Sequence, residues 1–186
     1  MEKFFAFSEE YHISEGLETV LRKAAQKVII AKNQLLLEEG RVCKYIYFLE
    51  KGFVRGFYYK DGKDVTTWFA SENEFVTSMY SFVSQKPSIE NIESLEESSL
   101  YAIHYDGLQE IYRTYPEFNL IGRILTEKYY IDLEERTLSL QFQTAKDRYT
   151  TLLAKEPYIL QKASLGHIAS YLGMSQETLS RIRAKV

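Results

Sequence analysis

Between about Lys27 and His104, the apolar residues fall in short runs separated by turn-forming pairs, a pattern typical of β-strands. The runs cover residues 28–31, 34–38, 45–50, 53–59, 64–70, 89–95 and 98–103. The Asp61-Gly62 pair favours a tight hairpin turn between two of these runs. Many short strands at close spacing predict an antiparallel β jelly-roll barrel.

The pattern is helical on both sides of this region. Residues 1 to about 26 predict a short helix whose apolar face carries Leu17, Val20, Leu21 and Ala24. Residues 105 to about 155 predict a long helical stretch that is interrupted around Pro116. The sequence as a whole therefore predicts an α+β fold.

One stripe of this long stretch has the spacing of a coiled coil. Its members recur at alternating three- and four-residue steps and are Ile121, Ile124, Lys128, Ile131, Glu135, Leu138 and Phe142. Two of them are charged, so the seam is imperfect. The stripe fits either a helix lying on its own barrel or a dimerisation helix over about 117–140.

The last residues, 164–186, predict two short amphipathic helices joined by a turn. Gly173 suits the left-handed end of the first helix, and Ser175 is a good N-cap for the second. Leu179 and Ile182 then face inward. The opposite face carries Gln176, Glu177, Ser180 and Arg181. An amide, a carboxylate, a hydroxyl and a guanidinium suit base edges in a major groove, so the pattern predicts a helix-turn-helix that binds DNA. Because such a motif typically binds a two-fold site as a symmetric pair, we favour the dimerisation helix over a helix lying on its own barrel.

Charge is distributed unevenly along the chain. The net charge is −3, yet residues 161–186 carry four basic side chains against one carboxylate. A basic end on an acidic body can contact phosphates locally. We place the domain break between about residues 140 and 144, with a sensory domain at 1–140 and a DNA-binding domain at 141–186.

Several classes of function lack support in the sequence. Cys43 is the single cysteine, which excludes a disulfide or a cysteine-ligated metal cluster within one chain. The three histidines lack metal-ligand spacing, and no phosphate-binding loop or nucleophile motif occurs. We therefore expect no enzyme and identify no cofactor. With no signal peptide and no apolar run of membrane-spanning length, we expect a cytoplasmic protein without membrane contact.

The order of barrel, long helix and helix-turn-helix resembles the cyclic-AMP-receptor-like (Crp/Fnr) family of bacterial transcription regulators. The resemblance rests on YIYFLEKGFVRGFYYKDGKDVTTWFASENEF and IASYLGMSQETLSRIR and covers essentially the whole chain. It implies a homodimer that binds double-stranded DNA in a sequence-specific way, with RNA polymerase as a further candidate partner.

The resemblance also assigns roles near the carboxyl end. It implies that Glu177 accepts from a cytosine amino group and that Arg181 contacts guanine with two hydrogen bonds. Ser175 and Thr178 would anchor phosphate. Gln176 stands where the family often has arginine. Many members continue into a β-hairpin wing, and we expect most of that wing to be missing here.

The family's cyclic-nucleotide contacts are not reproduced. Thr77-Ser78 aligns with a Gly-Glu pair that holds the ribose, and Ser88-Ile89 aligns with an Arg-Ser pair that holds the phosphate. No arginine occurs between Arg55 and Arg113. A buried phosphate without a cationic partner is costly, so we do not expect cyclic AMP to bind in the usual way. The candidate ligand-binding residues for an unknown small-molecule effector are Arg55, Thr77, Ser78, Tyr80 and Ser88.

Arg55 could face the interior of the barrel, where it would serve an anionic ligand, or point outward into solvent. We favour the outward position. Two other classes of protein compete with the regulator. One is a ligand-binding or protein-interaction module that has lost DNA binding, which the missing wing and the acidic body support. The other is a jelly-roll enzyme, which would require a bound metal.

Overall fold

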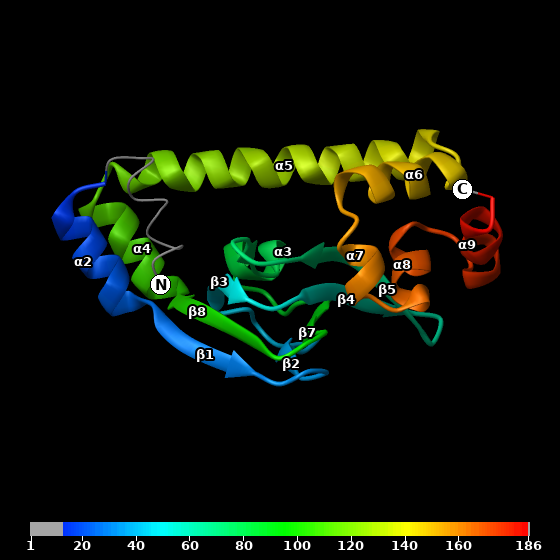
Figure 1. Cartoon of the computed structure of the whole chain (residues 1–186). Helices are drawn as coiled ribbons and strands as arrows, with labels where there is room; N and C mark the ends of the chain where they lie inside the picture. The colour runs from blue at the N-terminus through cyan, green and yellow to red at the C-terminus, as the bar shows by residue number, and fades with distance from the viewer. Residues whose placement is uncertain (1–12, 186) are drawn as a thin grey trace.

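The computed structural model describes residues 13–185, and its centre is a pair of antiparallel four-stranded sheets (Figure 1). The first sheet has the order β1 (Gln26–Ile30), β8 (Ser98–His104), β3 (Tyr45–Lys51), β6 (Phe75–Val76). The second sheet has the order β2 (Leu35–Leu37), β7 (Asn91–Ser94), β4 (Val54–Lys60), β5 (Lys63–Ala70). The predicted mixture of antiparallel strands and helices is confirmed.

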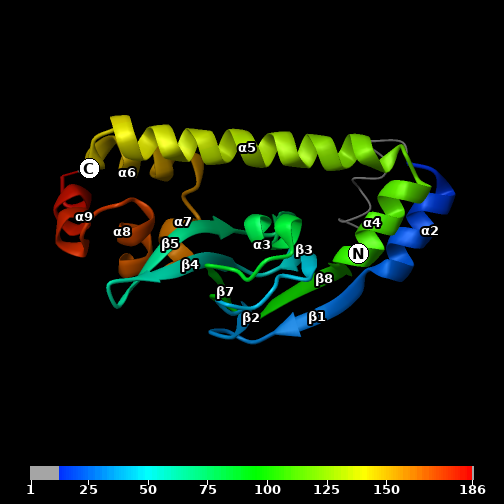
Figure 2. The same ribbon diagram turned by 180° about the vertical axis from the view of Figure 1, so that it is seen from behind.

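Helices flank the sheets at both ends. They are α2 (Glu15–Ala24), α3 (Met79–Ser84), α4 (Tyr105–Thr114), α5 (Phe118–Phe142), α6 (Ala145–Lys155), α7 (Ile159–Lys162), α8 (Leu165–Tyr171) and α9 (Gln176–Arg183). Figure 2 shows α5 running past the sheets from the α2–α4 end to the α6–α9 end. None of the helices within residues 13–185 is long and apolar enough to cross a membrane.

The hairpin between β4 and β5 turns at the predicted pair. Asp61 and Gly62 have φ values of 53° and 74°, as the hairpin turn that suits twisted strands requires. Lys60 and Lys63 are the last paired residues beside it. The sequence pattern missed β6 and α3, because two and six residues are too few to show a period.

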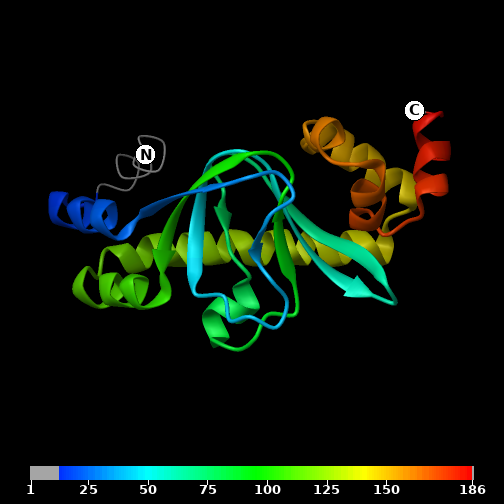
Figure 3. The ribbon, with the colours of Figure 1, turned by 90° about the horizontal axis from the view of Figure 1, so that it is seen from below.

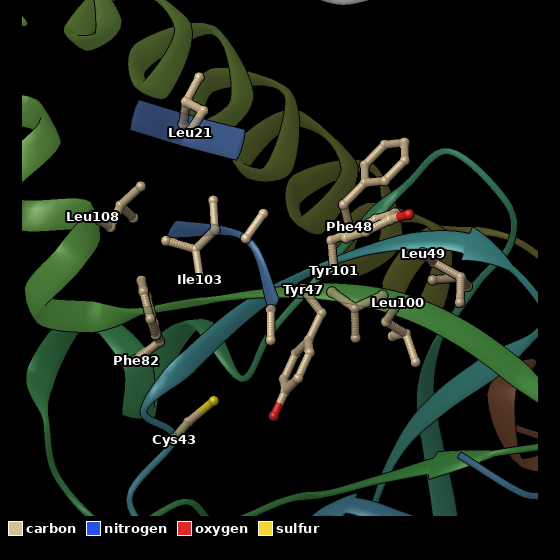
Figure 4. Close-up of a cluster of buried hydrophobic side chains, with 14 of the residues drawn as sticks. Leu21, Cys43, Tyr47, Phe48, Leu49, Phe82, Leu100, Tyr101, Ile103 and Leu108 are labelled. Atoms are coloured by element: carbon tan, nitrogen blue, oxygen red, sulfur yellow. The ribbon is translucent and has the colours of Figure 1, made fainter. Parts of the chain in front are cut away.

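The main core occupies both faces of the first sheet, because neighbouring side chains of a strand point to opposite faces and both sets are buried here. On β3, Leu49 points between the sheets, where Val54 and Ile92 of the second sheet are also fully buried. Phe48 points the other way, toward the helices. Figure 4 shows Phe48 and Tyr101 on the side of the sheet that faces α5.

The long helix α5 is buried only near its start, at Phe118 and Ile121. Its later apolar side chains are mostly exposed, among them Tyr129, Tyr130, Ile131, Leu133, Leu138, Leu140 and Phe142. The interpretation of this helix as lying flat on its own sheets is therefore wrong for its second half.

A second core joins the carboxyl-terminal helices to the second sheet. Phe53 and Leu95 of the sheet domain are buried with residues of α6–α9, namely Tyr149, Leu152, Ile159, Ile168, Ala169, Leu172 and Leu179. In Figure 3 these helices gather beside the far end of the β4–β5 hairpin. The two parts of the chain thus share a packed interface.

Candidate nucleic-acid interface

The two terminal helices are set by their caps. The Ser164 hydroxyl accepts from the His167 amide at 3.1 Å and starts α8. Gly173 has a φ of +63° between the helices, and a Cβ there would lie 2.9 Å from Leu140 Cδ2. The Ser175 hydroxyl accepts from the Thr178 amide at 3.2 Å and starts α9. The turn geometry is that of a helix-turn-helix.

Helix α9 has one anchored face and one open face. Leu179 is fully buried and Ile182 packs beside it. The side chains predicted to read bases are all exposed, and they are Gln176, Glu177, Ser180 and Arg181. The structure therefore brings the four residues together on the solvent-exposed face of α9.

Hydrogen bonds within α9 orient its polar side chains. Arg181 Nη2 donates to Thr178 Oγ1 at 3.2 Å, so the guanidinium is held along the helix. The hydrogen bond from Ser175 holds the pKa of Glu177 below its ordinary value. Glu177 is thus an ionised acceptor at neutral pH, as contact with a cytosine amino group requires. Ser175 and Thr178, expected at phosphate, also serve as the cap and the arginine's partner.

Helix α8 is docked on the second sheet. The Thr66 amide on β5 donates to Ser170 Oγ at 3.1 Å. The preceding helix α7 is tied to the loop after β7, where Lys162 Nζ lies 2.6 Å from Glu96 Oε1. Aromatic rings continue the contact: Phe69 stacks on Phe53 at 5.4 Å between ring centroids and meets Tyr171 edge-on at 5.1 Å. The contacts between α8 and the sheet domain therefore also fix the position of α9, which follows α8 directly.

Arg55 lies at the centre of this interface. Its side chain is on the outer face of β4, since neighbouring Val54 belongs to the core between the sheets. It is nevertheless 3% exposed, because α8 covers it. Nη2 donates to Asp64 Oδ2 at 2.7 Å, and Nε donates to Glu93 Oε2 at 2.9 Å. The expectation of a solvated Arg55 is wrong, and its guanidinium already holds two carboxylates.

His167 of α8 completes the cluster. Its Nε2 atom is 3.8 Å from Asp64 Oδ2, and its buried Nδ1 has no hydrogen-bond partner among the described residues. Burial lowers the pKa of His167, and the charge of Arg55 lowers it further, against the opposing effects of Asp64 and Glu93. The imidazole is thus neutral at neutral pH.

The end of α8 is held by two arginines from the preceding helices. Arg136 Nη2 on α5 donates to the Tyr171 carbonyl at 2.8 Å, and its guanidinium carbon lies 4.2 Å from the Tyr171 ring centroid. Arg148 Nε on α6 donates to the Leu172 carbonyl at 2.7 Å. Cations at the carboxyl end of a helix complement its dipole. These contacts connect α5 and α6 to the carboxyl end of α8.

The predicted ligand-binding residues do not form one site. Ser78 and Ser88 are buried and their hydroxyls lie 3.1 Å apart. Thr77 Oγ1 donates to the Tyr45 carbonyl at 3.0 Å. Tyr80, on α3, is 56% exposed, whereas Ser78 and Ser88 are buried. Arg55 belongs to the interface between α8 and the second sheet.

Sequence reasoning missed Glu90, two residues after Ser88. Its Oε2 accepts from Trp68 Nε1 at 3.0 Å. Gly56 permits this arrangement, because a Cβ there would collide with the Trp68 indole. Burial raises the pKa of Glu90, and hydrogen bonds from Ser78 and Trp68 oppose that rise. A half-buried acid therefore lies beside Ser78, which aligns with the family's ribose contact, and Ser88, which aligns with its phosphate contact.

Comparison with known proteins agrees with this architecture. Residues 27–115 match the family model of the cyclic nucleotide-binding domain. FixK2 from Bradyrhizobium japonicum aligns with a TM-score of 0.75 at 19% identity, covering 87% of this chain and 83% of FixK2. The c-di-GMP-responsive global regulator CLP from Xanthomonas campestris aligns with a TM-score of 0.72 at 19% identity, covering 92% and 91% of the two chains. No curated protein sequence matches the chain.

A third structure is a transcriptional regulator of the Crp/Fnr family from Eubacterium rectale, with a TM-score of 0.75 at 14% identity over 94% of this chain and 83% of that one. Residues 27–115 thus match a cyclic nucleotide-binding domain, and the chain shares its overall fold with these three structures. The chain has the Crp/Fnr fold, and the resemblance found in the sequence is confirmed.

Proposed function

We propose that the protein is a cytoplasmic, homodimeric transcription regulator that binds specific DNA sequences through α9. The observation that carries the proposal is the exposed set of Gln176, Glu177, Ser180 and Arg181 on a helix anchored by fully buried Leu179. Four polar side chains on a rigid support can meet base edges as a unit.

The exposed apolar side of α5 supports the dimer. Ile131, Leu138 and Phe142 are members of the predicted stripe, and they are 55%, 49% and 78% exposed. Exposed apolar side chains aligned along a helix are typical of a helix-pairing surface. Two copies of α5 packed together would present two copies of α9 to a two-fold DNA site.

The sensory domain is proposed to act without cyclic AMP. A cyclic phosphate entering beside Ser78 and Ser88 would meet the Glu90 carboxyl instead of a guanidinium. An ionised Glu90 opposes the binding of an anion there, and because burial raises the pKa of Glu90, this opposition weakens as pH falls. The pairing of Arg55 with Asp64 and Glu93 also leaves that cation occupied.

The contacts of α5 give a route for regulation. Arg136 joins α5 to the end of α8, and Leu140 lies against the turn at Gly173. A ligand that favours one position of α5 relative to the second sheet would favour one placement of α9. RNA polymerase remains a candidate partner on the basis of the family alone.

Selection of bound sequences from random duplexes, with and without cell extract, tests this function. The proposal expects one enriched motif with two-fold symmetry and an affinity that falls steeply with salt. Enrichment that depends on extract would reveal an effector. No retention of DNA at low salt would instead favour the interaction module that has lost DNA binding.

A further inference from the structure

A cleft opens between the two sheets where β1 and β2 run along their margins. Its volume is about 570 Å³, within the range of small-molecule sites. Residues from both sheets line it, among them Val28, Leu35, Leu36, Tyr45, Tyr47 and Ala102. The positions that align with the family's nucleotide contacts, Thr77, Ser78 and Ser88, do not line this cleft. It is therefore a separate site.

Tyr47 supplies a polar group at the floor of the cleft. The residue is 8% exposed, and its hydroxyl has no hydrogen-bond partner within residues 13–185. In Figure 4 the hydroxyl points away from Phe48 and Tyr101, on the side of β3 that faces the second sheet. The hydroxyl is not one of the enclosed polar atoms of residues 13–185, so solvent reaches it from the cleft, and it can donate to a molecule bound there.

The proton of this hydroxyl stays in place over the whole physiological range. Burial raises the pKa of Tyr47, and nearby Cys43 and Tyr45 raise it further. Tyr47 is therefore a neutral hydrogen-bond donor, and a molecule that binds it must offer an acceptor.

The rest of the lining sets the other properties of that molecule. Val28, Leu35 and Leu36 provide an apolar wall, and Gln26 and Gln34 add uncharged amides. The lining residues include no lysine, arginine, aspartate or glutamate. Taking a charged group out of water without a counter-charge is strongly unfavourable, so anions and cations are disfavoured. Flat rings suit the space beside the aromatic rings of Tyr45 and Tyr47, whose centroids lie 6.0 Å apart.

We propose that the cleft binds an uncharged heteroaromatic molecule whose ring nitrogen or carbonyl accepts a hydrogen bond from Tyr47. The apolar wall covers the ring, and the Tyr47 hydroxyl fixes its orientation. That the bound molecule acts as an effector rests on the proposed regulator function. That the cleft binds such a molecule does not.

Quinoline and naphthalene form a matched pair of probes, because they differ in one ring nitrogen and both are neutral at pH 7.5. Binding to the full chain is measured by saturation-transfer NMR and by shifts of the β1 and β2 amide signals, without DNA. Wild type is expected to bind quinoline about tenfold more tightly than naphthalene. Tyr47→Phe is expected to remove this difference and to leave naphthalene binding unchanged.

Two further variants control the experiment. Tyr59→Phe removes the same hydroxyl from an exposed position on β4 and is expected to bind both probes as wild type does. Leu35→Trp places a large ring at the half-exposed margin of the cleft and is expected to reduce binding of both probes. Equal affinity for the two probes in wild type, or an unchanged preference in Tyr47→Phe, would overturn the proposal. Absence of binding would do so while leaving DNA recognition by α9 untouched.

Discussion

The Ser170 hydroxyl accepts a 3.1 Å hydrogen bond from the backbone amide of Thr66, a residue 104 positions earlier in the chain. The bond joins α8, the first helix of the reading unit, to β5 of the sheet domain. Arg55, Asp64 and His167 lie next to it. Stability of the whole chain and placement of the reading helix therefore depend on the same contacts.

Replacing Arg55 with leucine is expected to destabilise the protein. The substitution leaves the Asp64 and Glu93 carboxylates, which lie on the two strands beside β4, without their shared cation. Breaking a fully buried ion pair costs about 3–5 kcal/mol, and the 34% exposure of the Asp64 side chain reduces the expected loss to about 2–3 kcal/mol. Urea unfolding measures it. Arg41→Leu, at a side chain 78% exposed, is the control, and equal losses in the two variants would contradict the buried cluster.

His167 is expected to make stability fall with acid. Burial and Arg55 hold its folded-state pKa below 6.5, so the unfolded chain takes up the proton first as pH falls. Its contribution is present above about pH 6.5 and is lost as pH falls through the folded-state pKa. Thermal unfolding from about pH 8 to pH 5 compares wild type with His167→Gln.

The pKa values of Glu90 and Glu156 are raised in the folded state, so these two groups increase stability as pH falls. They do so in wild type and in His167→Gln alike, and their effect cancels in the comparison. The stability advantage of wild type over His167→Gln should therefore shrink toward low pH. A difference that stays constant across the range would show that the imidazole does not titrate at this interface.

Arg181→Ala is expected to weaken binding to the selected DNA site by about 1–3 kcal/mol and to change binding to random duplexes little. The reason is the loss of a two-bond contact to a guanine edge. Fluorescence anisotropy at fixed salt measures both affinities. Arg183→Ala, at another exposed position of α9, tests for a simple charge effect. Equal loss on both kinds of DNA would mean that Arg181 contacts phosphate only.

Leu138→Glu is expected to dissociate the dimer, because it places a charge in the middle of the apolar stripe of α5. Sedimentation velocity measures the change from dimer to monomer. Thr137→Glu adds the same charge one residue away from the stripe, also at an exposed position, and should leave the dimer intact. A monomeric wild type would contradict the assignment of the stripe directly.

Cyclic AMP is expected to give no heat of binding in isothermal titration at neutral pH. Glu90 occupies the region where a phosphate would need a cation, and Arg55 is held by carboxylates. At lower pH, protonation of Glu90 would ease this repulsion, so any weak binding should increase with acid. Tight binding at pH 7.5 would refute this interpretation of the pocket.

The parts of the fold that the sequence predicted are those with strong local signals. Asp61-Gly62 specifies its own turn, and the spacing of Leu165, Ile168 and Leu172 specifies a helix without reference to the rest of the chain. The exposed face of α9 follows in the same way once Leu179 is taken as the inward residue. Short elements such as β6 carry no such signal.

The site could not be completed from the sequence, because its remaining members meet only through tertiary packing. Strand alternation places Arg55 on the outer face of β4 but does not show that α8 covers that face. Glu90 and Trp68 are far apart in the chain, and their hydrogen bond depends on the missing side chain of Gly56. In the same way, the Gln176 side chain lies beside Gly166, where a Cβ would come within 2.7 Å of its Nε2 atom.

β5 is the outermost strand of the second sheet, so one row of its backbone amides and carbonyls has no neighbouring strand. Helix α8 covers part of that row, and Ser170 satisfies the Thr66 amide there. Lifting α8 away would open a template on which the strand of another molecule can add. The docking of the reading unit therefore also guards the protein against self-association into extended sheets.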